Sequence, residues 1–261
     1  MSGANSETVL VTGASSGIGW ELAKCFAADG SRLVLTARNT ETLQSLADEL
    51  HRTHKVEASV LTADLALRET PERVFRELQG RGIAVDVLVN NAGFGVWGKF
   101  AELPLSRQLE MLQVNITALI QLTGLFLPGM VQRQRGGILN VASVAGFLPG
   151  PGMAVYYATK SCVLSFTEAL AEELAGANVT VTALCPGPTL TNFGNIARAD
   201  KARMVRPARM SAKAVAAYGH RAFRKQRVVA IPGLQNRVLS FLTRLGPRSI
   251  IRKTAGKFNG T

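Results

Sequence analysis

The amino-acid sequence predicts an α/β protein whose parallel β-sheet carries helices on both faces. Over the first half of the chain, short runs of aliphatic and β-branched residues alternate with longer stretches of helical periodicity. The four runs span residues 8–12, 32–37, 56–62 and 85–90. Parallel strands need crossover connections, usually helices, so four such units in succession favour this architecture. Ligands of such sheets bind beyond the carboxyl ends of the strands.

The first run leads directly into a glycine-rich turn, TGASSGIG, at residues 12–19. A helix is predicted from Gly17 to about Asp29. Glycines let the backbone turn sharply and approach a phosphate, and the N–H groups and positive dipole end of the helix attract the anion. The predicted phosphate-binding residues are Gly13, Ser15, Ser16, Gly17, Ile18 and Gly19.

The second run ends in Ala37-Arg38-Asn39, without an acid. In nicotinamide-dinucleotide sites an acid at this place often binds the ribose 2′-OH. Arg38 would instead bind a 2′-phosphate with its planar guanidinium. We therefore predict NADP(H) rather than NAD(H) as cofactor. The alternative is a solvated arginine that opens the loop before the next helix.

The next two strands also end in groups that would border a ligand at the same edge. Residues 40–54 form an amphipathic helix, and Pro71 begins another at a position that proline favours. Strand 56–62 is followed by Ala63-Asp64-Leu65, and strand 85–90 ends in an N-N-A-G motif. The predicted cofactor contacts here are Asn39, Asp64, Leu65, Asn91, Ala92 and Gly93.

The second half of the chain brings four further candidate groups to this edge. A long helical stretch over residues 105–133 contains Asn115 among apolar neighbours, and a fifth strand ends at Ser143. A helix over 156–174 begins with Tyr156, and the strand 179–184 runs into a proline-glycine turn. Asn115 is either a hydrogen-bonded structural residue or the holder of a water that relays protons to Lys160.

Tyr156 and Lys160 lie four residues apart, so both side chains share one face of the predicted helix. An ammonium within a few ångströms favours the phenolate and lowers the tyrosine pKa from its usual value of about 10. Such a hydroxyl suits general acid–base catalysis on an alcohol or ketone, and Ser143 could bind the same oxygen. The alternative is a surface Tyr–Lys pair. Tyr157 has no lysine at this spacing and is expected to pack.

Six motifs in order resemble the short-chain dehydrogenase/reductase family. They are TGASSGIG, NNAG, Asn115, Ser143, Tyr156-x-x-x-Lys160 and Pro186-Gly187, over roughly residues 7–192. The resemblance implies one Rossmann-type, doubly wound domain of about seven strands spanning 1–261, with a substrate-loop insertion at 188–210 and a basic C-terminal segment at 211–261. It implies a catalytic tetrad of Asn115, Ser143, Tyr156 and Lys160.

The resemblance also implies a reaction and an assembly. The enzyme would interconvert a ketone or aldehyde and an alcohol, with Tyr156 as general acid or base and Lys160 on the nicotinamide ribose. The turn that would hold the nicotinamide carboxamide contains Pro186, Gly187, Thr189 and Thr191. Family members usually pair through the helices that carry Asn115 and Tyr156, so a homodimer or homotetramer is expected.

The family builds its substrate pocket from loops that are apolar in this chain. They correspond to residues 94–100, 144–155 and 192–210. The apolar candidates are Phe94, Trp97, Phe147, Leu148, Met153 and Phe193. A hydrophobic ketone or alcohol is therefore expected, although several of these side chains would equally serve to pack the loops.

The net charge of +12 is concentrated at the end of the chain. All 18 Asp and Glu lie within residues 1–200, whereas residues 201–261 contain 15 of the 30 Lys and Arg and no acid. Within this segment Leu234, Val238, Phe241, Leu242 and Leu245 recur at helical spacing until Pro247 interrupts. Three interpretations stay open: a helix on an anionic membrane surface, a site for an acidic carrier or acyl thioester, or a helix packed over the pocket with solvated arginines.

Composition favours a soluble, cytoplasmic protein. The N-terminus lacks the pattern of a signal peptide, and no apolar run approaches the ~20 residues of a membrane span. Cys25, Cys162 and Cys185 lie far apart among apolar neighbours, which indicates reduced core residues and neither a disulfide nor a metal site.

A rival function is a non-catalytic protein that uses a nucleotide-loaded fold as a sensor or nucleic-acid binder. The basic segment is its only support. Few aromatic residues are present there to stack bases, and no groove-reading pattern is apparent, so no nucleic-acid partner is expected. A dehydratase or epimerase of related fold is also conceivable, but such relatives usually carry a longer C-terminal substrate region.

Overall fold

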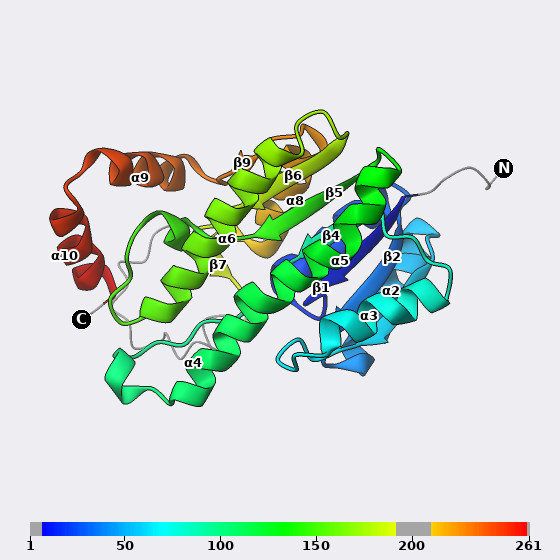
Figure 1. Cartoon of the computed structure of the whole chain (residues 1–261), viewed down its shortest axis with the longest axis horizontal. Coiled ribbons are helices and arrows are strands. Elements are labelled where there is room, and N and C mark those ends of the chain that lie inside the picture. Colours follow the sequence, from blue (N-terminus) through cyan, green and yellow to red (C-terminus); the bar gives the residue numbers. More distant parts are fainter. Residues whose placement is uncertain (1–6, 192–209, 260–261) are drawn as a thin grey trace.

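The computed structural model describes residues 7–191 and 210–259, and these contain a seven-stranded parallel sheet (Figure 1). The strands are β1 (Thr8–Thr12), β2 (Arg32–Ala37), β3 (Ala58–Thr62), β4 (Val87–Asn90), β5 (Gly136–Val141), β6 (Val179–Leu184) and β9 (Val229–Ala230). Their order is β3-β2-β1-β4-β5-β6-β9, and every neighbouring pair is parallel. The predicted doubly wound sheet is confirmed, with the third and fourth strands each beginning two residues later than expected.

The strand order places a topological switch at the middle of the sheet. The chain builds outward from β1 to β3 and then returns to β4 on the other side of β1. Connections leave the carboxyl ends of β1 and β4 in opposite directions, and this opens a crevice between them. Each nucleotide-binding motif of the sequence lies in a loop at this edge.

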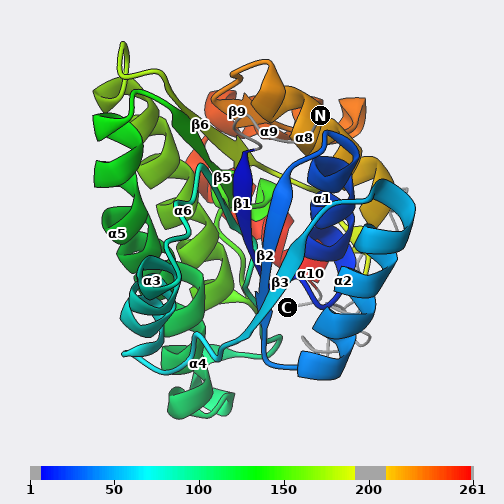
Figure 2. The same ribbon diagram turned by 90° about the vertical axis from the view of Figure 1, so that its right-hand side faces the viewer.

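Helices cover both faces of the sheet (Figure 2). One face carries α1 (Gly17–Ala28), α2 (Thr40–His54) and α8 (Ala212–Arg224). The other carries α3 (Thr70–Gly80), α5 (Ala118–Gln132) and α6 (Ala154–Glu173). Side chains alternate along β1, so Val9 and Val11 join the buried cluster beneath α1 and α2, and Leu10 joins the cluster beneath α3 and α5.

The predicted long helix is interrupted at the position of Asn115. A first segment, α4 (Leu105–Leu112), is followed by the π-helical turn η2 (Gln113–Thr117) and then by α5. By length, and by the mean hydropathy of 1.6 of an 18-residue window within it, the continuous stretch Leu105–Gln132 matches a membrane span, contrary to the sequence expectation. A core helix passes the same test, and Leu122, Phe126 and Met130 of this one are buried against the sheet.

Ionic and aromatic contacts join the beginning of the chain to α8. The Arg224 guanidinium binds Glu7, with Nη2–Oε2 at 2.7 Å, and Asp29, with Nε–Oδ2 at 2.9 Å. Beneath this cluster the fully buried Phe26 ring contacts the His220 ring edge-on at 4.8 Å and the Phe223 ring at 5.9 Å between centroids. The N-terminal helix is therefore covered by residues almost 200 positions later.

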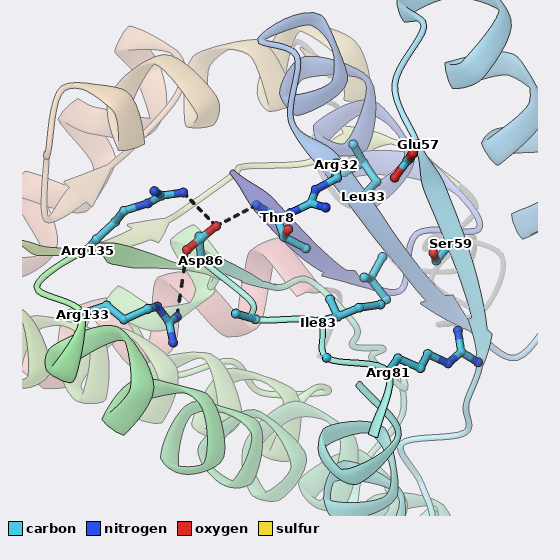
Figure 3. Close-up of a pocket in the computed structure, with 13 residues that line it drawn as sticks. Thr8, Arg32, Leu33, Glu57, Ser59, Arg81, Ile83, Asp86, Arg133 and Arg135 are labelled. Atoms are coloured by element: carbon cyan, nitrogen blue, oxygen red, sulfur yellow. Dashed lines mark hydrogen bonds and ion pairs between the residues drawn. The ribbon is translucent and has the colours of Figure 1, made fainter. Parts of the chain in front are cut away.

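A cavity of about 600 Å³ opens at the amino ends of the strands, opposite the nucleotide-binding motifs (Figure 3). The buried Asp86 carboxylate there accepts a hydrogen bond from Thr8 N at 2.9 Å and from Arg135 Nη2 at 3.1 Å, and Arg133 lies 4.0 Å away. These contacts tie β1 to β4 and to the α5–β5 connection. The Asp86 carboxylate therefore has a structural role.

The C-terminal segment adds two helices beyond the sheet (Figure 1). These are α9 (Leu234–Leu245), which confirms the helical periodicity of the basic segment, and α10 (Arg248–Asn259), which follows Pro247. A small parallel pair joins β7 (Thr189–Leu190) to β8 (Met210–Ser211). The rest of the predicted substrate loop, with Phe193, lies outside the described residues, and the division of the chain at 188–210 and 211–261 stays a prediction.

Candidate active site

The glycine-rich turn is fixed to the loop after β4 by hydrogen bonds around Thr12. Thr12 Oγ1 accepts from the main-chain N–H groups of Asn91 and Ala92, both at 3.0 Å, and donates to Val89 O at 3.2 Å. In return, Asn91 Nδ2 donates to the carbonyl oxygens of Thr12 at 2.9 Å and Gly13 at 3.0 Å. The two sides of the crevice are thereby held together at its floor.

Two glycines of the turn are required by this close approach. Gly13 has a left-handed φ of +64°, and a Cβ there would lie 2.9 Å from Ala92 Cα. A Cβ on Gly19 would lie 2.3 Å from Asn91 Nδ2. Ser16 precedes α1 in an extended conformation and makes no side-chain cap hydrogen bond among the described residues. The first N–H groups of α1 therefore keep their capacity to bind an anion, as the sequence predicts.

The β2 and β3 loops place the predicted ribose-binding residues at the same edge. Arg38 is exposed directly after β2. The Asn39 side chain caps α2, because Thr42 N donates to its Oδ1 at 2.9 Å. Asp64 Oδ1 accepts from Ala66 N at 3.0 Å, and Leu65 is buried. Of this set, Arg38 offers a long cationic side chain to a ligand.

Asn115 connects the loop after β4 to the helix that carries the tyrosine. Its Oδ1 accepts from Phe94 N at 3.0 Å, and its Nδ2 donates to Phe94 O at 2.9 Å and to Thr159 Oγ1 at 3.0 Å. Thr159 Oγ1 in turn donates to Tyr156 O at 2.7 Å. Of the two interpretations of Asn115, this geometry favours the hydrogen-bonded structural residue for its side chain.

Ser143 lies at the end of β5, where it caps the short 3₁₀ helix η3 (Val144–Phe147). Its buried Oγ accepts from Ala145 N at 3.1 Å and lies 3.4 Å from Pro186 O, to which it donates. A hydrogen bond joins the Ser143 and Tyr156 side chains. Ser143 and Tyr156 are thus brought together as the sequence predicts.

The relation between Tyr156 and Lys160 differs from the sequence expectation. Lys160 Nζ is buried and donates to Val141 O at 2.7 Å, and it lies 5.9 Å from the centroid of the Tyr156 ring. Burial raises the pKa of Tyr156 to about 12, and burial lowers the pKa of Lys160 to about 8. Desolvation of the phenol therefore sets the direction of the Tyr156 pKa, and the predicted lowering by the Lys160 ammonium is not seen in this conformation, where Val141 O holds Nζ.

The turn after β6 closes the other side of the site. Pro186 O accepts from Val144 N at 3.0 Å, and Thr189 Oγ1 donates to Gly187 O at 2.8 Å. Thr191 reaches the glycine-rich turn, since a Cβ on Gly17 would lie 3.1 Å from Thr191 Cγ2. The predicted carboxamide-binding turn therefore borders both the phosphate-binding turn and Ser143.

The apolar loop residues divide between packing and the substrate side. Phe147 packs against the buried cluster around Leu164, and Met153 is buried, so the packing interpretation holds for these two. Trp97 is half-buried, and its Nε1 donates to Asn259 O at 3.2 Å. The C-terminal end of α10 thus reaches the loop after β4.

Three residues that sequence reasoning missed hold this arrangement together. They are Thr12, Thr159 and Asn259. Two of them have a signal in the sequence. Thr12 lies inside the glycine motif, and Thr159 directly precedes Lys160. Asn259 has no local signal. Its side chain is buried, donates to Pro151 O at 2.8 Å and accepts from the Tyr157 hydroxyl at 3.4 Å, all remote in sequence.

Comparison with known proteins adds the following. The family model for short chain dehydrogenases matches residues 7–202. A 3-oxoacyl-[acyl-carrier-protein] reductase of Aquifex aeolicus is 35% identical over 178 residues, which cover 68% of this chain and 72% of that protein. A short-chain dehydrogenase from Sphingobium yanoikuyae, solved in complex with NADPH, has a TM-score of 0.83 at 33% identity and covers 91% of this chain and 93% of its own. The bulky-bulky ketone specific alcohol dehydrogenase from Comamonas testosteroni has a TM-score of 0.79 at 31% identity and covers 96% of each chain.

Proposed function

The chain belongs to the short chain dehydrogenase family and is an NAD(P)-dependent oxidoreductase, and we propose that it interconverts a hydrophobic ketone or aldehyde and its alcohol with NADP(H). The observation that carries this proposal is the meeting of Ser143, Tyr156 and Lys160 beside the glycine-rich turn, at the carboxyl edge of the sheet.

The residues present fit a dinucleotide. The glycine turn packs so closely on the loop after β4 that a Cβ on Gly13 or Gly19 would clash, and the N-terminus of α1, whose first N–H groups can bind a phosphate, lies at this edge. Arg38 would take the 2′-phosphate, Lys160 the nicotinamide ribose, and the turn at 186–191 the carboxamide. When bound, the cofactor supplies the hydride and, in its oxidised form, a positive charge that lowers the pKa of a nearby phenol.

In the reductive direction, Tyr156 donates a proton to the carbonyl oxygen of the substrate. Its hydroxyl is protonated at neutral pH, which is the form that a general acid needs. Ser143 holds the same oxygen through its hydroxyl. Asn115 and Thr159 act as positioning residues, since they fix the first turn of α6 to the loop after β4.

The preference for NADP(H) over NAD(H) rests on Arg38 and on the absence of an acid at the end of β2. A guanidinium binds a phosphate with two parallel hydrogen bonds, whereas a ribose hydroxyl needs an acceptor there. The NADPH complex of the Sphingobium relative supports the same assignment.

A hydrophobic substrate is supported by the apolar loops around Trp97 and by the ketone specificity of the Comamonas relative. An acyl thioester is supported by the 3-oxoacyl reductase relative and by the basic C-terminal segment. We place the enzyme in the cytoplasm as a homodimer or homotetramer. The exposed Leu105 and Leu109 of α4 and Ile120 of α5 support pairing through the helices next to Asn115.

The test is NADPH oxidation, followed by absorbance, against hydrophobic ketones, aldehydes and 3-oxoacyl thioesters, with NADH alongside. We expect turnover of at least one class, and we expect Tyr156→Phe to abolish turnover while NADPH binding, measured by fluorescence, stays nearly intact. Near-normal turnover by Tyr156→Phe would remove this residue from the proton transfer. If no substrate of the panel is turned over although NADPH binds, the result would favour the non-catalytic binding protein.

A further inference from the structure

The helix α9 is docked on the protein by its polar face, the reverse of an ordinary amphipathic helix. Ser240 is buried, and Asn236 and Thr243, four residues before it and three after it, are half-buried. The Asn236 side chain donates to Pro232 O at 2.7 Å and rests on the turn after β6, where a Cβ on Gly187 would lie 2.5 Å from it. The polar stripe of α9 is thus its contact with the fold.

The opposite face of α9 presents large apolar side chains to solvent. They are between 48% and 74% exposed and comprise Leu234, Val238, Leu239, Phe241, Leu242 and Leu245. Scattered exposed apolar residues are ordinary, but a stripe along a whole helix marks an interaction site. Ile250, at the start of α10, is 60% exposed and extends this surface.

The charge around this stripe is of one sign. Arg237 and Arg244 flank it on α9, and the exposed cations of α10 are Arg248, Arg252, Lys253 and Lys257. Residues 210–259 contain no Asp or Glu. Helices that lie in a membrane interface combine an apolar face with flanking Lys and Arg, which attract anionic headgroups.

We propose that α9 and the first turn of α10 form a docking surface for an anionic lipid bilayer. A second copy of this chain would fit the apolar stripe. However, packing α9 and α10 of one copy against those of another would bring their unpaired Lys and Arg residues together. An anionic headgroup layer complements both the apolar and the charged parts of the surface. Figure 1 shows α9 and α10 together at one end of the molecule, so both helices can reach the same membrane surface.

The docking surface adjoins the site at two points. Besides the contact of Asn236 with Gly187, the far end of α10 holds Trp97 and Tyr157 through Asn259. A bilayer beneath α9 would therefore place its apolar phase beside the loops that take the substrate. This step rests on the proposed function, whereas the docking surface itself does not.

The test is flotation of the full chain, loaded with NADPH, with vesicles of phosphatidylcholine alone or mixed with phosphatidylglycerol. We expect binding to the mixed vesicles at low salt and weak binding to phosphatidylcholine alone. Raising the salt to about 1 M shortens the screening length from about 10 Å at 0.1 M to about 3 Å and should release most of the protein. No binding to the mixed vesicles at low salt would overturn the proposal.

A double substitution on α9 and a single control substitution locate the surface. Phe241 and Leu242 on α9 are 60% and 53% exposed, and the control residue Leu67, in the loop between β3 and α3, is 51% exposed. We expect Phe241→Ser/Leu242→Ser to lower vesicle affinity roughly tenfold or more, because two large apolar side chains no longer enter the interface. Leu67→Ser should bind as the wild type. Arg237→Gln/Arg244→Gln should cost roughly fivefold for each arginine.

Light scattering and NADPH oxidation with a water-soluble ketone accompany each variant. If Phe241→Ser/Leu242→Ser dissociates an oligomer and leaves vesicle binding unchanged, the face is an interface between copies and the proposal is overturned. Vesicle binding by a chain that turns over no member of the panel of hydrophobic ketones, aldehydes and 3-oxoacyl thioesters would retain the docking surface and refute the proposed function. Ketone reduction by a chain that binds no vesicle would retain the proposed function and refute the docking surface.

Discussion

The substitution Thr12→Val tests whether the hydroxyl at the end of β1 holds the crevice together. Valine keeps the shape of the 1% exposed side chain, so no cavity forms. The main-chain N–H group of Ala92, 3.0 Å from Oγ1, loses its acceptor, whereas the N–H group of Asn91 keeps its second acceptor, Val89 O, at 3.1 Å. A buried donor left unsatisfied costs about 1–3 kcal/mol, so we expect the free energy of unfolding to fall by about 1–3 kcal/mol. NADPH affinity should fall as well.

Urea unfolding, with refolding as a check of reversibility, measures the stability change as a shift in midpoint at constant slope. The matched control is Thr62→Val, which removes an exposed hydroxyl that lies 2.7 Å from Thr40 Oγ1. Surface substitutions of this kind usually change stability by less than about 0.5 kcal/mol. If Thr12→Val is no more destabilising than this control, then the reasoning from the Thr12 hydrogen bonds is refuted.

Three further predictions concern the cofactor, the buried lysine and the C-terminal contact. Arg38→Ala should lose about 1.5–3 kcal/mol of NADPH binding, with NADH binding unchanged in titrations, and an unaltered NADPH-to-NADH preference would contradict the assignment. Burial lowers the pKa of Lys160 to about 8, so between pH 8 and about 10 the unfolded chain binds a proton that the folded chain does not. The stability of the wild type relative to Lys160→Met should therefore rise with pH in this window, by up to about 1.4 kcal/mol per pH unit in urea unfolding, and a flat difference would refute the lowered pKa. Asn259→Ala removes the acceptor of the Tyr157 hydroxyl and the donor to Pro151 O. It should raise KM for bulky ketones and leave KM for NADPH unchanged, and equal changes in both would indicate general loosening of the fold.

Local patterns predicted the parts of this protein that depend on local structure. The glycine turn, the strand ends and the Tyr156–Lys160 spacing are short-range features. They meet at one edge because all strands of a parallel sheet end at the same side. The pKa of Tyr156 was not predictable in this way. Its direction depends on how deeply the phenol is buried and on Lys160 Nζ being drawn to Val141 O, which are products of packing.

The C-terminal helices show the same distinction. Spacing of Leu234, Val238 and Leu245 identified α9 and its apolar stripe. Periodicity does not say which side of a helix faces the protein. The apolar side is usually the one that packs on the fold, but in α9 the polar side, with Ser240, is buried. The π-helical turn at Asn115 and the two-residue strand β9 likewise depend on contacts between distant residues, and neither has a sequence signature.

The contact between α1 and α8 bears on how the chain is made. Phe26 leaves the ribosome about 200 residues before Phe223 and His220, which is roughly 10–40 s at about 5–20 residues per second. During that time the outer side of α1 lacks its cover, and Glu7 and Asp29 lack the arginine that neutralises them. The apolar outer side of α1 is therefore exposed on the nascent chain until α8 has been synthesised. A truncated product that ends before residue 211 lacks α8, so this surface stays uncovered.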